Sequence, residues 1–177
     1  AIAHIRAMEQ HLQFDDTNVV VNILPIDHIT PLLTLHIRAV ITGAAQVQVD
    51  TAAFISNPFI WFDVLQKYGG THTFSPNFAF KLITDQLALN PGRHWDLSGV
   101  KYFKNGGELV SYDVAKAFLN MTEIFGAGEH TFQPAYGLTE ASGAITATTG
   151  FNDSQVFHLK KGTLTNRPVK TTAADPE

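Results

Sequence analysis

Residues 19–49 read VVVNILPIDHITPLLTLHIRAVITGAAQVQV, and this stretch decides the fold. The apolar run at 19–24 is rich in β-branched residues, long enough for a strand and too short for a helix. Thr30 and Pro31 supply a capping hydroxyl and a first-turn proline, which predict that a helix begins there. Residues 46–49 alternate polar and apolar side chains, as a second strand does. A strand, a helix and a strand in succession predict a βαβ unit.

The same alternation continues along the chain. Further strands are expected at residues 71–74, 100–103 and 131–135, and segments 144–148 and 155–159 are expected to pair beyond the fifth strand. Helices are expected at residues 2–12, 58–68, 78–89 and 111–125. Their ends carry caps or stops: Asn57, Ser111, Gly43, Gly69, Gly70 and Gly126. The pattern predicts an α/β fold, with a mostly parallel sheet flanked by helices.

Two regions are expected. Residues 1–159 would form one α/β subdomain. From residue 160 the chain turns polar and ends in TTAADPE, which is typical of a tail or linker.

The composition excludes several classes of function. The 177 residues include no cysteine, which excludes a disulfide scaffold, a cysteine-ligated metal site and a thiol nucleophile. Lysine and arginine total 12 against 16 acidic side chains, and the net charge of −4 argues against nucleic acid or an anionic membrane as a partner. No apolar run reaches the roughly 18 residues that a membrane crossing needs. The 8 histidines do not show the spacing of a metal-binding motif. We also expect a cytoplasmic protein.

Polar residues and glycines follow the predicted strands. The segments are PIDH at 25–28, SPN at 75–77, NGGE at 105–108 and YGLTE at 136–140. In a parallel sheet, ligands bind beyond the carboxyl ends of the strands, where these segments would meet. Such loops also need Gly, Asn and Ser for turns and caps, so a purely structural role stays open for each.

The YGLTE segment carries the most chemical information. A tyrosine ring can stack on a purine, a threonine hydroxyl can bond a phosphate oxygen, and a glutamate carboxylate can hold a hard cation such as Mg²⁺. The NGGE segment offers bare backbone next to an acid, which suits close packing against a planar ligand. Taken alone, each segment can equally be a strand end or a turn.

Together these segments resemble the motifs of the adenylate-forming enzymes: acyl- and aryl-CoA ligases, peptide-synthetase adenylation domains and luciferases. YGLTE at 136–140 resembles their Tyr-Gly-x-Thr-Glu core motif, and NGGE at 105–108 resembles their glycine-rich adenine segment. LPIDH at 24–28, SPNFAF at 75–80 and WDLS at 95–98 are similar to fatty-acyl-AMP ligases and to acyl-activating loading modules of hybrid polyketide/peptide synthetases. The resemblance runs from about residue 15 to residue 159, with the motifs in order.

The resemblance implies a binding site for ATP. Tyr136, followed by Gly137, would stack on the adenine. The other side of the base would be lined by Asn105, Gly106, Gly107 and Glu108.

The resemblance also implies the catalytic residues. Thr139 would contact the α-phosphate, and Glu140 would bind Mg²⁺. His28 would border the acyl site and gate the carboxylate. Asn77 and Phe78 would line the acyl channel.

The implied reaction is attack of a carboxylate, from a fatty acid or a related acid, on the α-phosphorus of ATP to give acyl-AMP and pyrophosphate. The acyl group would then pass to an acyl carrier protein in polyketide or nonribosomal peptide synthesis. An acyl-CoA ligase, with coenzyme A as the acceptor, is the alternative. A non-catalytic interaction domain of the same fold also stays open.

Several parts of the family pattern are missing from this sequence. They are the phosphate loop with its lysine, the ribose-binding aspartate and the C-terminal lid with its catalytic lysine. No general G-x-x-x-x-G-K-[ST] loop replaces them. We therefore expect the chain to be the central part of a large N-terminal domain, inactive without the rest of its parent multidomain enzyme.

Overall fold

The sheet has six strands in the order β2-β1-β3-β4-β5-β6. The computed structural model describes residues 2–141, 143–148, 150–160, 162–163 and 167–172. Neighbouring strands run parallel, except for the antiparallel pair β5 and β6. The strands are β1 (Val19–Asn22), β2 (Ala45–Gln48), β3 (His72–Ser75), β4 (Tyr102–Asn105), β5 (Phe132–Leu138) and β6 (Gly143–Ala147). The predicted α/β fold with a mostly parallel sheet is confirmed.

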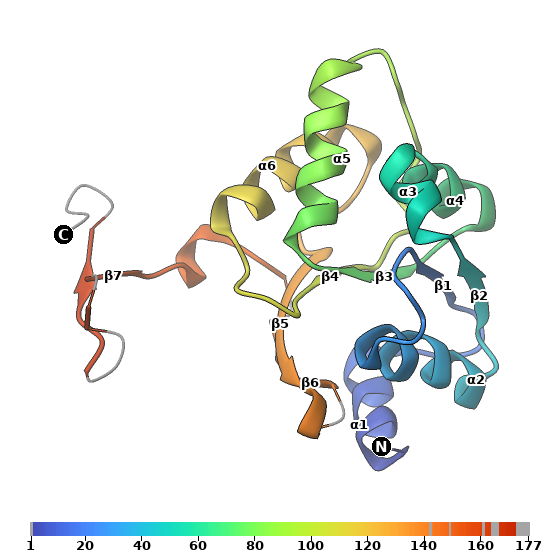
Figure 1. Ribbon diagram of the computed structural model, residues 1–177, viewed down its shortest axis with the longest axis horizontal. Helices are drawn as coiled ribbons and strands as arrows, with labels where there is room; N and C mark the ends of the chain where they lie inside the picture. The colour runs from blue at the N-terminus through green and yellow to red at the C-terminus, as the bar shows by residue number, and fades with distance from the viewer. Residues whose placement is uncertain (1, 142, 149, 161, 164–166, 173–177) are drawn as a thin grey trace.

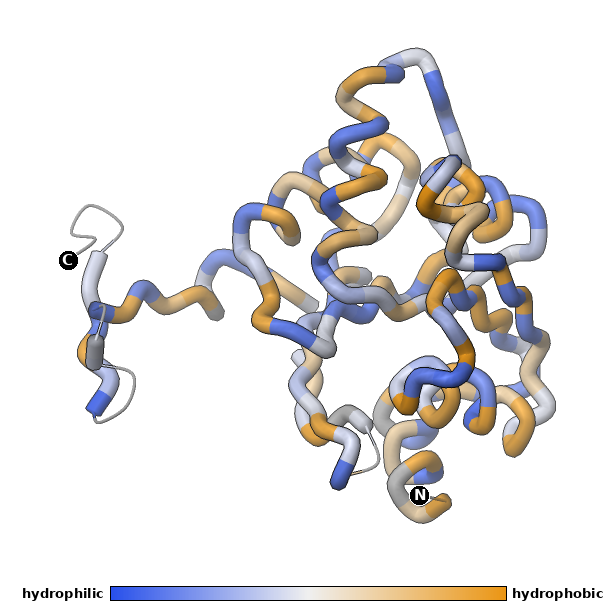
Figure 2. Tube along the Cα trace, viewed as in Figure 1, coloured by the Kyte–Doolittle hydropathy of each residue, from blue (hydrophilic) through white to orange (hydrophobic). Residues whose placement is uncertain are grey.

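Helices cover both faces of the sheet (Figure 1). One face carries α3 (Thr51–Ser56), α4 (Ile60–Tyr68), α5 (Asn77–Leu89), α6 (Tyr112–Thr122) and the 3-10 turn η2 (Glu123–Phe125). The other carries α1 (Ile2–Leu12), the π-helix η1 (Pro31–Ile37) and α2 (Arg38–Thr42). Apolar and polar residues alternate along α5, as expected of a helix with one face on a sheet (Figure 2). No helix in the described ranges is long and apolar enough to cross a bilayer.

The larger core lies between the sheet and α4, α5 and α6, and it is aromatic. Trp61, Phe80, Phe103 and Phe118 are fully buried there. The rings of Phe80 and Phe118 meet edge to face with centroids 4.8 Å apart. The Trp61 indole N–H donates to the Thr73 hydroxyl at 3.0 Å, so this buried donor is paired. The packing makes a rigid base for the strand ends.

The smaller core lies on the opposite face of the sheet. Leu12, Leu35 and Ala39 pack there from the helices against Val20 and Phe74 of the strands. This face also buries polar side chains, among them Arg38 of α2, His72 at the start of β3 and Lys104 near the end of β4.

The helix after β1 differs from the expectation in two ways. Residues 31–37 form a π-helix, and α2 follows it and ends at Gly43, which has a φ of +78°. Thr30 has helical backbone angles and its side chain caps nothing, while its carbonyl accepts a bond from the Thr34 hydroxyl at 2.7 Å. The apolar pattern does not separate the two helix types, because a single wide turn displaces the apolar face only locally.

One short helix, α3, was not expected. The Asp50 side chain caps it by accepting a bond from the Ala53 backbone N–H at 2.9 Å. The prediction that Asn57 caps the next helix was wrong, because Asn57 ends α3 and α4 begins after Phe59 without a side-chain cap. Ser111 caps α6 as predicted, accepting from the backbone N–H of residue 114 at 3.4 Å.

Strand β5 is longer than expected and continues through the YGL of the motif. Tyr136 pairs with Thr146, Leu138 pairs with Gly143, and the register shifts just after Tyr136. The parallel partner β4 reaches only to the residue beside Pro134, so the β5–β6 hairpin extends past the other strand ends. The antiparallel partner supplies ladder bonds where the parallel one has ended. The predicted pairing of residues 144–148 beyond the fifth strand is confirmed.

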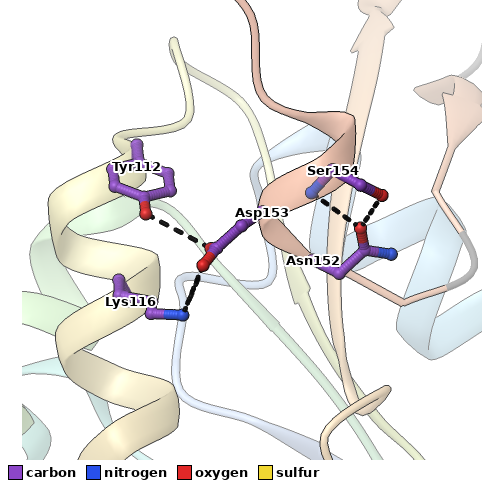
Figure 3. Close-up of polar contacts among 5 residues, drawn as sticks. All are labelled: Tyr112, Lys116, Asn152, Asp153 and Ser154. Atoms are coloured by element: carbon purple, nitrogen blue, oxygen red, sulfur yellow. Dashed lines mark hydrogen bonds and ion pairs between the residues drawn. The ribbon is translucent and has the colours of Figure 1, made fainter. Parts of the chain in front are cut away.

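Residues 155–159 do not join the main sheet, which corrects the prediction for that segment. Strand β7 (His158–Leu159) pairs antiparallel with β8 (Lys170–Thr171) in a separate two-stranded sheet. Just before it, the 3-10 turn η4 (Asp153–Gln155) lies against α6. The Asp153 carboxylate accepts bonds from the Tyr112 hydroxyl at 3.2 Å and the Lys116 ammonium at 3.0 Å (Figure 3). These contacts hold the chain on the outside of α6, and the following residues extend away from the main sheet (Figure 1).

Candidate functional site

The loop after β4 brings bare backbone against β5. Asn105 ends β4, and its side-chain amide donates to the Ser75 carbonyl at the end of β3 at 3.0 Å. A Cβ on Gly106 would lie 2.6 Å from the Ala135 carbonyl oxygen, so no larger residue fits there. Gly107 has a φ of +85°, a backbone angle that favours glycine. The two glycines therefore permit a close approach between this loop and β5.

A cavity of about 640 Å³ lies between the loop and the β5–β6 hairpin. Gly107 and Glu108 line it from the loop, and Tyr136 and Gly137 line it from β5. The Tyr136 side chain is 63% exposed, so its ring is open to a ligand. The volume lies within the range of ordinary small-molecule sites. The structure thus brings together four of the six residues that were expected to surround a planar base, while Asn105 and Gly106 are not in the wall of this cavity.

Two smaller cavities meet at His28. One, of about 150 Å³, is lined by residues that include His28, Gly106, Gly107, Tyr136, Gly137 and Thr139. The other, of about 420 Å³, is lined by Leu24, Pro25, Asp27, His28, Thr30, Phe74, Pro76 and Gly107. The Nδ1 atom of His28 accepts a bond from the Thr30 backbone N–H at 3.3 Å, which orients the ring. Gly107 lines all three cavities, so they adjoin at the glycine loop.

Asn77 and Glu108 join the start of α5 to the loop after β4 by hydrogen bonds. The Glu108 carboxylate accepts a bond from the Asn77 backbone N–H at 2.7 Å. The Asn77 side chain donates to the Leu109 carbonyl at 2.6 Å and accepts from the Ser111 backbone N–H at 3.1 Å. We call these three bonds the Asn77 clasp. The residue before α5 is Pro76, whose side chain cannot cap the helix. Glu108, from the loop after β4, supplies the cap instead. Its carboxylate lies at the N-terminus of α5, the positive end of the helix dipole.

Phe78 is not brought together with His28. Its ring packs against Phe54 with centroids 6.3 Å apart, and the side chain is absent from the walls of all three cavities. Asn77 is also absent from those walls and is joined to the loop after β4 through the clasp.

Thr139 and Glu140 lie in the 3-10 turn η3 (Thr139–Ala141), directly after β5. Thr139 lines the 150 Å³ cavity, while the exposed Glu140 side chain lies outside the three walls. Within the described ranges, no group of three histidine or acidic residues could hold a metal ion alone. Magnesium is commonly held by one or two carboxylates together with phosphates and water, and the exposed Glu140 carboxylate fits that arrangement.

Ionisable groups are buried beneath this edge of the sheet. Burial lowers the pKa of the Lys104 ammonium to about 7, and the Arg38 charge acts in the same direction. Burial also lowers the pKa of the His72 imidazole to about 2, helped by the charges of Arg38, Lys101 and Lys104. Arg38 itself has a pKa lowered to about 10 by burial, with Glu9 opposing that change.

Phe74 and Thr30 line both cavities at His28 and were not expected from the sequence. Phe74 and Thr73 are adjacent in β3 (sequence HTFS), so their side chains point to opposite faces of the sheet. This alternation does not reveal which of the two faces borders a cavity, because that depends on the helices packed there.

Residues 1–172 match the family described as AMP-binding enzyme. Aspulvinone E synthetase melA of Aspergillus terreus is 32% identical over 132 residues, which cover 72% of this chain and 14% of that protein. Nonribosomal peptide synthetase btyA of the same fungus is 27% identical over 173 residues, covering 96% of this chain and 19% of that protein. The chain therefore spans less than a fifth of the length of these two relatives.

Solved structures of adenylation domains share the fold. The adenylation domain of a keto acid-selecting NRPS module, bound to keto acyl adenylate, is 29% identical with a TM-score of 0.88 over 97% of this chain and 33% of that one. A fatty acyl-adenylate ligase from L. pneumophila, in complex with acyl adenylate and pyrophosphate, is 27% identical with a TM-score of 0.75 over 84% of this chain and 26% of that one. The family match, the motifs and the fold agree, and the chain belongs to the AMP-binding enzymes of the adenylate-forming superfamily.

Proposed function

We propose that this chain forms the part of an adenylation domain that holds the adenine and α-phosphate of ATP and the carboxylate of an acid. An oxygen of the carboxylate attacks the α-phosphorus, a new O–P bond forms, and pyrophosphate leaves with the electrons of the broken bond. The proposal rests on one observation: Tyr136, Gly137 and Gly107 line both a base-sized cavity and the smaller cavity at His28 and Thr139. A nucleotide and an acid in these two cavities would meet at a shared wall.

In the 640 Å³ cavity, the exposed ring of Tyr136 offers a stacking face for adenine. The backbone of Gly107 and Glu108 packs against the opposite side. The clasp supports this use, because it ties residues 108–111 to α5 and so sets the width of the cavity.

The reacting groups would meet at the 150 Å³ cavity. The Thr139 hydroxyl can donate to an α-phosphate oxygen, and His28 borders the place where the carboxylate enters. Glu140 would hold Mg²⁺, which neutralises charge on the phosphates. The chain itself contributes mainly position and hydrogen bonds, which are effective in this kind of reaction.

The body of the acid would occupy the 420 Å³ cavity beside His28. Its walls include the apolar Leu24, Pro25, Phe74 and Pro76, which suit an apolar acid such as a fatty acid. A keto acid is the second candidate, because the adenylation domain of the keto acid-selecting NRPS module is similar in structure over 97% of this chain. The acceptor would be a carrier-protein thiol. The structure of McyG A-PCP complexed with phenylalanyl-adenylate, 29% identical with a TM-score of 0.83, supports this.

The test is acid-dependent ATP–pyrophosphate exchange by the full-length protein, with fatty, α-keto and α-amino acids. Tyr136→Ala should raise the KM for ATP roughly fivefold, since a lost aromatic stack is worth about 1 kcal/mol. The KM for the acid should hardly change. Glu140→Ala should sharply weaken the magnesium-dependent rate.

The matched control for Tyr136 is Tyr112→Ala, which removes a tyrosine that binds Asp153 outside the cavities. Glu123→Ala, in η2, is the matched control for Glu140. Both controls should exchange like the wild type. Exchange unaffected by both Tyr136→Ala and Glu140→Ala would overturn the proposed site. Transfer to coenzyme A in place of a carrier would change the proposed acceptor.

A further inference from the structure

A polar compartment is buried between the sheet and the helices η1 and α2. Thr34, Arg38, His72 and Lys104 line it, together with Leu12, Leu35, Thr73, Phe74 and Tyr102. The four polar side chains are only 8%, 4%, 2% and 7% exposed, respectively. The open volume of about 10 Å³ is close to that of one water molecule. We call this the basic compartment.

Several polar atoms of the basic compartment have no partner. The Nε atom of Arg38 and the Nε2 atom of His72 are buried without a hydrogen bond. The Lys104 ammonium makes no hydrogen bond to the part of the chain that the structure describes, but it keeps some contact with solvent, whereas the Oε1 atom of Glu9 is buried without a partner. Gln133, next to Lys104 in the strand register, also has an unpaired buried side-chain oxygen. Buried polar groups in proteins are nearly always paired, so this cluster requires an explanation.

The charges in the basic compartment do not balance. Arg38 and Lys104 are both cationic groups, and Glu9 of α1 is the acid that acts on Arg38. The Arg38 guanidinium also lies over the Phe14 ring, 4.3 Å from its centroid. Because its pKa is about 7, Lys104 is cationic only in part at neutral pH; together with Arg38 it faces the single carboxylate of Glu9, which leaves room for one more accepting group. Burial is the main cause of the lowered pKa of Lys104, and the Arg38 charge adds to it.

The basic compartment lies directly below the candidate acid site. Lys104 precedes Gly106 by two residues on the same face of its strand, which places it roughly 7 Å deeper along the sheet. Phe74 pairs with Lys104 across β3 and β4, and its ring lines the compartment and both cavities at His28. Thr34 lines the compartment and would lie 3.0 Å from a Cβ on Gly143, a residue in the wall of the 150 Å³ cavity. The side chains of Phe74 and Thr34 therefore lie between the two spaces.

We propose that the basic compartment recognises the far end of the activated acid. The ligand would be a carboxylic acid with a second, hydrogen-bond-accepting oxygen, roughly 7 Å from its reacting carboxyl carbon. Lys104 and Arg38 donate to that oxygen once the Phe74 ring turns aside. This rests on the proposed function and narrows its substrate class, since a plain fatty acid would leave the compartment unpaired.

A purely structural role does not account for Lys104. Replacing a buried, uncompensated charge by an apolar side chain of similar size is often neutral or stabilising. A group kept in place at a cost to stability, beside a candidate substrate cavity, is typical of a functional group.

The test uses the full-length protein and pairs of acids that differ in one distal group. 3-(4-Hydroxyphenyl)propionate is compared with 3-phenylpropionate, and adipate with hexanoate, by ATP–pyrophosphate exchange. In at least one pair, the oxygenated acid should have a kcat/KM about tenfold higher or more. Lys104→Met should reduce that preference to within about twofold, by lowering the rate with the oxygenated acid only.

Lys101→Met is the matched control. Lys101 is an exposed lysine just before β4, at the end away from the site, where it donates to Asn18 at 3.0 Å. This variant should keep the preference. Hydrogen exchange of the amides in β4 supplies a second readout. Lys104→Met should leave their protection equal or greater, whereas a structural lysine would lose protection when replaced.

The outcomes separate the two proposals. No exchange with any acid by the wild type would overturn the proposed function and this inference with it. Exchange in which hexanoate and phenylpropionate match or exceed their oxygenated partners would overturn the inference and leave the proposed function standing. A preference that survives Lys104→Met would also overturn it.

Discussion

The His72 side chain is buried, and only one of its two ring nitrogens has a hydrogen-bond partner. Its Nδ1 atom lies 2.8 Å from the Thr71 hydroxyl, and its ring contacts Phe14 and Tyr102 at centroid distances of 4.8 and 4.9 Å. Burial, together with nearby positive charges, lowers its pKa from 6.5 to about 2. Between these two values the unfolded chain binds a proton that the folded chain does not. Stability is therefore complete above about pH 6.5 and falls as the pH drops below it.

This linkage predicts a pH dependence for the chain. Between pH 6.5 and pH 5, His72 should contribute a loss of about 2 kcal/mol in the free energy of unfolding, at 1.36 kcal/mol per pH unit. His72→Gln should remove that part of the slope, even if it lowers stability at pH 7. Urea unfolding at pH 7, 6 and 5 measures both slopes. Equal slopes for the two proteins would show that His72 titrates in the folded state.

Among the elements, the beginning of α5 links the helix layer to the glycine loop. The Asn77 clasp joins a helix end to residues 108–111, which form one wall of the largest of the three site cavities. The carboxylate of Glu108 has a structural partner as well as a place in that wall. A change at Asn77 should therefore reach the nucleotide without any direct contact.

Asn77→Ala should raise the KM for ATP about tenfold while changing kcat less, because the cavity wall loosens. It should also lower the free energy of unfolding by about 1–2 kcal/mol, for two lost hydrogen bonds. Asn90→Ala is the matched control at the other end of α5, where the Asn90 side chain donates to the Gln86 carbonyl at 2.8 Å. Steady-state kinetics of the full-length protein measure the effect. An unchanged KM for ATP in Asn77→Ala, with the stability loss present, would limit the clasp to a structural role.

At the scale of the whole molecule, the chain covers 33% of the keto acid-selecting adenylation domain structure and 26% of the fatty acyl-adenylate ligase structure. The phosphate-loop lysine and the lid lysine of the family pattern are not in this sequence. We predict that the purified 177-residue chain shows no ATP–pyrophosphate exchange with any acid, while the full-length protein does. Radiolabelled pyrophosphate exchange checks this. Measurable turnover by the chain alone would mean that these 177 residues contain the essential groups.

The order of strands and helices was predictable because each depends on short-range patterns. Residues 19–24 are mostly apolar and β-branched, Ser111 caps α6, and Gly126 ends the 3-10 turn η2 that follows α6. The predictions were wrong where contacts with neighbouring elements determine the local structure. Thr30 caps nothing because the helical backbone already includes it. Residues 155–159 left the sheet because Asp153 binds α6 instead.

The sequence predicted which motif residues lie near the candidate site, but only partly what each residue does there. Tyr136, Gly107 and His28 line adjoining cavities, as their positions at the predicted strand ends suggested. Phe78 packs against Phe54, and Asn77 binds the loop at 109–111. A one-residue difference along α5 changes the direction of a side chain by roughly 100°, so sequence position alone does not say which of the two meets the site.

By itself, the sequence determined the α/β class, the βαβ succession and the family, because these depend on periodicity and on contiguous motifs. Only the tertiary structure decided which motif residues share a cavity, how Glu108 reaches the end of α5, and that Lys104, Arg38 and His72 converge below Phe74. These three side chains are more than 30 residues apart from one another in the chain. Their meeting depends on strand register and on the helices packed over the sheet. Burial then changes their pKa values, since the charge of a side chain depends on its surroundings in the folded state.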